Sequence, residues 1–76
     1  MSKQYTHLKE LAKRVGLKLR TEPQDDGSFD LVLCDGRGER LCTEYDTNDM
    51  VESIGVYAGG HRDFKDAVAE YETAVA

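Results

Sequence analysis

The first apolar residues of the chain recur every three to four positions. On a helix they form a single stripe, made of Tyr5, Leu8, Leu11, Ala12 and Val15. Ser2 can cap the first turn, and Gly16 follows the last apolar position, where a left-handed glycine commonly ends a helix. The pattern therefore predicts an amphipathic helix over residues 3–15.

From Leu17 onward the period changes to two. Apolar and polar residues alternate over residues 17–22, 29–34 and 40–45, which predicts three half-buried strands. The two segments between them are rich in Gly and Asp, and the first also holds the only proline, so both predict turns. Because these connections are short, neighbouring strands are expected to be antiparallel.

The same pattern predicts the strand register. A shift by one residue would place Arg40 and Glu44 among the leucines, so the register that keeps them outside is favoured. In the second hairpin the predicted pairs are Leu33–Leu41, Leu31–Thr43 and Phe29–Tyr45. In the first hairpin they are Leu17–Leu33, Leu19–Leu31 and Thr21–Phe29.

The last third of the chain predicts two helices. The first opens at Asp46–Asp49, which offers several capping side chains, and its stripe contains Met50, Val51, Ile54, Tyr57 and Ala58. Because Gly55 interrupts it, residues 48–60 form either one regular helix or a short helix and a loop. After Gly59 and Gly60, a final helix over residues 62–75 is expected to bury Phe64, Ala67, Val68, Tyr71 and Val75.

These elements predict an α+β domain in the order α-β-β-β-α-α, with a three-stranded antiparallel meander and helices packed on one face. A chain of 76 residues has room for one domain, residues 1–76, and only a thin core. Self-association would remedy a thin core, so a small homodimer is one alternative.

Neither end of the chain predicts export or a membrane anchor. The first residues are charged and lack an apolar signal region, and no apolar run approaches the ~20 residues of a membrane span. Two cysteines, Cys34 and Cys42, are too few for a disulfide scaffold. A cytoplasmic location, with no membrane contact, is therefore expected.

Charge is divided unevenly along the chain. Residues 1–20 hold six bases and one acid, a balance of +5, whereas residues 21–76 hold four bases and fourteen acids, a balance of −10. Such asymmetry can steer a partner, or it can let a basic helix neutralise an acidic body within the same domain.

The outer face of the predicted sheet is the first candidate site. The register places Val32 opposite Cys42, Cys34 opposite Arg40, and Arg20 near Asp30, giving a small apolar centre with a charged rim. The candidate partner-binding residues are Arg20, Val32, Cys34, Arg40, Cys42 and Glu44. The alternative is a solvated sheet face with cross-strand ion pairs.

Catalytic and metal chemistry find little support. Cys34 and Cys42 lack the short ligand spacing of zinc sites, and neither is expected beside His7 or His61 as a nucleophile and base would be. The Gly59–Arg62 segment lacks the Lys-Ser/Thr of a phosphate-binding loop. No catalytic residue, metal or cofactor is predicted, and the protein is not expected to be an enzyme.

Nucleic-acid binding is a second alternative. The order helix, three-stranded meander, helix resembles double-stranded-RNA-binding domains in topology only. Those domains bind phosphates through a basic cluster after a Gly-rich turn, whereas here Asp63 and Asp66 interrupt Arg62 and Lys65. The acidic body opposes a phosphate backbone. The basic first helix could still contact nucleic acid through Lys9, Lys13 and Arg14.

The leading hypothesis is a non-catalytic protein-interaction module, a small acidic modulator or inhibitor of a larger protein or nucleic-acid-processing complex. Its basis is the small size, the charge balance and the lack of a reactive constellation. Small acidic proteins of this kind occur among phage and mobile-element products that imitate nucleic-acid charge, which is an analogy of composition. A nucleic-acid-associated regulator and a homodimer are the alternatives.

Overall fold

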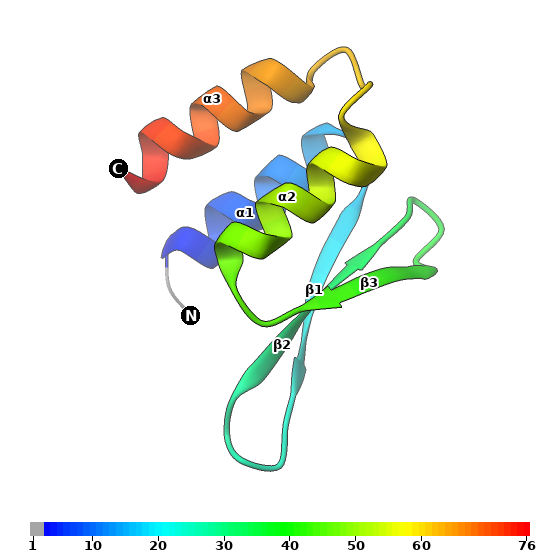
Figure 1. Cartoon of the computed structure of the whole chain (residues 1–76), viewed down its shortest axis with the longest axis vertical. Coiled ribbons are helices and arrows are strands. Elements are labelled where there is room, and N and C mark those ends of the chain that lie inside the picture. The colour runs from blue at the N-terminus through cyan, green and yellow to red at the C-terminus, as the bar shows by residue number, and fades with distance from the viewer. Residues whose placement is uncertain (1–2) are drawn as a thin grey trace.

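The computed structural model describes residues 3–76, so the predicted Ser2 cap lies outside the described part of the chain. Three helices and three strands follow the predicted order (Figure 1). Their bounds are α1 Lys3–Arg14, β1 Lys18–Pro23, β2 Phe29–Cys34, β3 Arg40–Glu44, α2 Thr47–Ala58 and α3 Phe64–Val75. The strands form one open antiparallel sheet in the order β1-β2-β3, which confirms the predicted α+β class.

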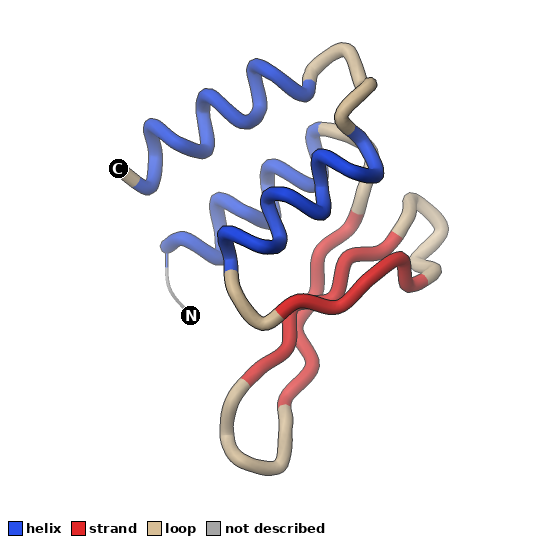
Figure 2. The backbone as a smooth tube through the Cα atoms, viewed as in Figure 1, coloured by secondary structure: helices blue, strands red, loops and turns tan. Residues whose placement is uncertain are grey.

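Two of the helices cover one face of the sheet. Helix α1 packs against β1, α2 packs against β2 and β3, and α3 packs chiefly against α1 (Figures 1 and 2). The largest fully buried side chains between these layers are Leu8, Leu33, Met50 and Ile54. The turn between β1 and β2 projects away from the helices, which leaves Phe29 54% exposed, although it was predicted to be buried.

Helix α1 ends as the sequence predicts. Gly16 has a positive φ of 81°, a conformation that glycine adopts without steric cost. This left-handed residue turns the chain so that the Leu17 N–H donates to the Ala12 carbonyl at 2.9 Å. The cap satisfies a terminal carbonyl of the helix and directs the chain straight into β1.

The register of the first hairpin differs from the prediction by two residues. Leu19 pairs with Leu33, and Thr21 pairs with Leu31. The prediction ended the strand before Pro23 and so placed the turn too early, whereas Pro23 is the last residue of β1. Because β1 lies at the edge of the sheet, a residue without an N–H can stay within it. The shift is even, so each residue keeps its predicted face.

The second hairpin begins in the predicted register and then departs from it. Cys34 pairs with Arg40 as expected, but a bulge follows, and Leu33 then pairs with Cys42. The bulge adds one residue to β3, so Leu41 and Cys42 both pack against the core. Every later residue of β3 changes face, and Tyr45, predicted to be buried, is 82% exposed.

Helix α2 is one regular helix, which resolves the two interpretations of residues 48–60. The Asp46 carboxylate caps it by accepting from the Asn48 N–H. Gly55 is tolerated within it because the Phe64 ring of α3 lies where a side chain would project, 3.3 Å from the position of an added Cβ. Val75, predicted to be buried in α3, is partly exposed.

Candidate binding groove

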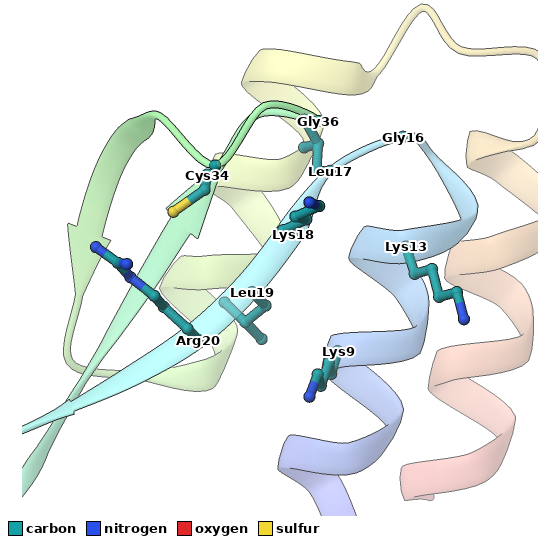
Figure 3. Close-up of a pocket in the computed structure, with 10 residues that line it drawn as sticks. Lys9, Lys13, Gly16, Leu17, Lys18, Leu19, Arg20, Cys34 and Gly36 are labelled. Atoms are coloured by element: carbon teal, nitrogen blue, oxygen red, sulfur yellow. The ribbon is translucent and has the colours of Figure 1, made fainter.

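A hollow lies where α1 meets the edge strand β1. It has a volume of about 540 Å³, and Figure 3 shows the residues around it. Its apolar lining residues are Leu17, Leu19 and Cys34, and three glycines of the adjoining turns, Gly16, Gly36 and Gly38, also line it. A hollow of this size suits a small ligand or a few residues of a peptide.

Four cationic residues line this groove. Lys9 and Lys13 are four residues apart on α1 and so lie on the same flank of the helix. Lys18 and Arg20 are two residues apart on β1 and so lie on the same face of the strand. In Figure 3, Lys9 and Lys13 project from α1, and Lys18 and Arg20 project from β1, with the Arg20 side chain extending over the sheet away from α1. No acidic residue of the described chain lines the groove.

Three of these four cations are free of acidic partners in the described part of the chain. Within residues 3–76, Lys9, Lys13 and Lys18 take part in no ion pair, while Arg20 lies 3.5 Å from Glu22. All four are exposed. Four like charges around one groove repel each other, and an anionic ligand would relieve that repulsion.

The six candidate residues of the outer sheet face do not share one surface. Arg20, Val32, Cys34 and Arg40 lie on the outer face as predicted. Cys42 and Glu44 lie on the inner face, because the bulge at Leu41 inverts the order of faces in β3. The hydroxyl of Ser53, from α2, donates to the Glu44 carboxylate at 3.1 Å, which places that side chain on the helical side of the sheet.

The expected apolar centre of the outer face is covered. Val32 is 0% exposed and Cys34 is 2% exposed. The strand register places Arg20 beside Val32 and Thr43 on its other side, and Glu22 pairs with both Arg20 and Arg40. This network covers the valine, so the centre of the face presents charged side chains in place of the expected apolar contact.

The three candidate bases of the first helix are also divided. Lys9 and Lys13 line the groove, but Arg14 turns towards α3 and forms an ion pair with Glu70. Arg14 therefore links the basic helix α1 to the acidic helix α3. Of the three candidate bases, only Lys9 and Lys13 remain available to a ligand.

The histidines and cysteines lie apart from one another. His7 lines a small cleft between α1 and α3, and the Nδ1 atom of His61 accepts from the Asp63 N–H at 3.1 Å. Cys34 and Cys42 are free thiols on opposite faces of the sheet. Within the described residues, no group of three or more His, Cys, Asp and Glu side chains is placed to hold a metal ion.

The groove was not predicted from the sequence, although residues 1–20 were recognised as a basic stretch. The four-residue spacing of Lys9 and Lys13 and the two-residue spacing of Lys18 and Arg20 define two basic stripes. The two stripes line one groove only because α1 packs beside the edge strand β1, and this packing is a tertiary contact that the sequence pattern does not show. A lysine pair on the flank of a helix followed directly by a basic strand was the available signal.

Comparison with protein-family models, with curated proteins and with solved structures finds no match to this chain. Across residues 3–76, no helix has the length and apolar character needed to cross a membrane.

Proposed function

We propose that this chain is a non-catalytic binding module that holds an acidic segment of a protein partner in the groove between α1 and β1. The observation that carries the proposal is the set of four cations, Lys9, Lys13, Lys18 and Arg20, around an apolar lining without an acidic residue. In a chain of net charge −5, this concentration of positive charge is the feature best suited to recognition.

The lining of the groove favours a peptide over a nucleic acid. An acidic peptide supplies carboxylates for the cations and apolar side chains for Leu17 and Leu19. A nucleic acid would need stacking surfaces for its bases, and no aromatic residue of the described chain lines the groove. The −10 balance of residues 21–76 would also repel a long phosphate backbone.

Binding an acidic segment gives a small domain a simple way to modulate a larger protein. The segment becomes unavailable to its own partners while the domain occupies it. This mode requires no reaction, in keeping with the separation of the thiols from the histidines.

The test uses a fluorescent peptide of alternating Glu and Val residues and, in parallel, a single-stranded oligonucleotide of equal charge. Replacing Lys13 and Lys18 together by Glu should weaken peptide binding by about tenfold or more, equivalent to about 1.4 kcal/mol. The matched control replaces Arg62 and Lys65, which lie outside the groove, by Glu and changes the net charge equally.

Retained peptide affinity in the control variant and loss in the groove variant supports the proposal. Equal weakening in both variants means that only net charge matters and contradicts it. Preference for the oligonucleotide would favour the nucleic-acid alternative instead. Sedimentation velocity of the free chain distinguishes a homodimer from either.

A further inference from the structure

We propose that the acidic segment binds by adding as a fourth strand to the free edge of β1. This inference rests on the proposed function of the groove and specifies how the groove would be occupied. It is carried by three observations, namely an unpaired strand edge within the groove, charge on both sides of that edge, and a proline that the edge already accommodates.

Strand β1 pairs with β2 on one side only. The Gln24 N–H donates to the Ser28 carbonyl at 2.8 Å, which fixes the alternation of the antiparallel ladder. Counting back along β1, the backbone groups of Glu22, Arg20 and Lys18 point towards β2. Those of Leu19 and Thr21 therefore point to the open side.

The start of β1 supports this assignment. The N–H of Leu17, which has the same parity as Leu19 and Thr21, donates to Ala12 of α1 and so points away from β2. The next outward groups along β1 belong to Leu19, which lines the groove, and to Thr21, which lies just beyond the lining residues. Unpaired N–H and C=O groups at a sheet edge are the template on which an extended peptide adds.

The second edge of the sheet is less available. On β3 the carbonyl of Leu41 accepts the hydroxyl of Tyr57, a side chain of α2. The bulge at Leu41 also interrupts the regular spacing of backbone groups in this strand. Of the two edges, β1 is therefore the one that offers a regular ladder.

The side chains beside the β1 edge specify the sequence of the added strand. On the outer face its residues would lie beside Lys18 and Arg20, close enough for carboxylates to pair with them. On the inner face its residues would contact Leu19 and the aliphatic parts of Lys9 and Lys13. The occupant that fits is an extended segment in which acidic and apolar residues alternate.

The same cations exclude other strands. Positive charge on an edge strand opposes pairing with basic segments, and it is a common means of preventing aggregation between sheets. An acidic segment turns this protective charge into attraction. The edge would then pair with acidic segments and not with basic ones.

Pro23 makes a sharp test possible. It is an outward-pointing position of β1, and its pairing with Phe29 of β2 is intact without an N–H. A proline at Thr21, which has the same parity, should likewise remove an outward donor without breaking the ladder to β2. Thr21→Val is the matched control, since it preserves the N–H and the shape of the side chain.

With the Glu-Val peptide as probe, Thr21→Pro should weaken binding by about tenfold or more, while Thr21→Val should bind like the parent chain. In the parent chain, peptide should slow hydrogen exchange of the Leu19 and Thr21 amides. On the ligand side, N-methylation at the peptide positions that face β1 should abolish binding, whereas methylation at the intervening positions should not. The peptide arm is independent of whether the proline variant folds.

The outcomes separate the two proposals. If the Lys13 and Lys18 reversal weakens binding but the methylated peptides bind equally and the amides exchange unchanged, the groove function stands and strand addition is wrong. If neither the reversal nor methylation affects binding, both are wrong. The chain could instead pair with a second copy of itself at the β1 edge. Loss of peptide binding as the protein concentration is raised would show this, and it would also overturn the inference.

Discussion

Glu22 and Arg40 lie on the two edge strands of the sheet, and their side chains form an ion pair across the central strand. The register places Val32 between them, and this valine has no exposed surface although no helix covers that face of the sheet. The ion pair therefore has a second role, which is to shield an apolar side chain from water.

Removing this ion pair should destabilise the protein modestly. Glu22→Ala and Arg40→Ala should each lower the free energy of unfolding by about 1 kcal/mol, since partly exposed pairs contribute about 0.2–1 kcal/mol and Val32 also becomes exposed. Urea denaturation of both single variants and of the double variant gives the coupling energy. A coupling of zero would show that the two side chains do not act together.

Gly55 and Phe64 should be coupled through space. Alanine at position 55 gains about 1 kcal/mol in helix propensity, but its Cβ would lie 3.3 Å from the Phe64 ring, which must move. The expected effect of Gly55→Ala is therefore near zero in the parent chain. In a Phe64→Ala background the same change should stabilise α2 by about 1 kcal/mol. Thermal unfolding of the four proteins measures this difference, and equal effects in both backgrounds would contradict it.

The pKa of Asp26 should depend on Ser28. The hydroxyl of Ser28 donates to the Asp26 carboxylate at 2.6 Å and its backbone N–H donates at 2.9 Å, and both hydrogen bonds lower the pKa of this carboxyl. Ser28→Ala removes the hydroxyl, so the pKa should rise towards its ordinary value while staying below it.

The lowered pKa of Asp26 means that its ionised form stabilises the folded state. The contribution of the ionised Asp26 is present above the ordinary pKa of an aspartate and is lost as the pH falls through the lowered value. An NMR titration of the carboxyl carbon in the parent chain and in Ser28→Ala measures the shift. Identical titration curves would show that the hydroxyl bond does not form in solution.

The two thiols should differ in reactivity. Cys34 is 2% exposed and Cys42 is half-buried, and they lie on opposite faces of the sheet. Under native conditions iodoacetamide should modify Cys42 much faster than Cys34, because a reagent must reach the sulfur. Mass spectrometry of the time course checks the order. Mild oxidation should produce no intramolecular disulfide, and finding one would contradict the assignment of faces.

The helices and strands followed closely from local patterns. The stripe of α1, the glycine that ends it and the capping aspartate of α2 are each encoded within a few residues, so Gly16 and Asp46 have their predicted roles. The hairpin registers are less local. Pro23 remains in its strand because of its place at the sheet edge, which a single strand cannot reveal.

The errors at the candidate site have one main cause. A bulge at Leu41 allows two successive side chains to reach the core, and it turns Cys42 and Glu44 inward. Neither turn chemistry nor alternation indicates such an extra residue, because Leu41 and Cys42 are both apolar and either one can face the core. The groove was missed for a different reason, since it is formed by residues of two elements whose packing is set by the whole domain.

The segregation of charge around the groove has a consequence for the rate of encounter. Far from the surface an approaching anion meets the field of a chain with net charge −5, whereas beside β1 it meets four cations. At physiological ionic strength the field decays over about 8 Å, so distant repulsion is screened while attraction at contact persists. A short acidic segment can therefore reach the groove in spite of the net negative charge. A long polyanion would also lie close to the acidic residues of the rest of the chain and be repelled by them. The domain would thus associate faster with a short acidic segment than with a long polyanion, before any specific contact is made.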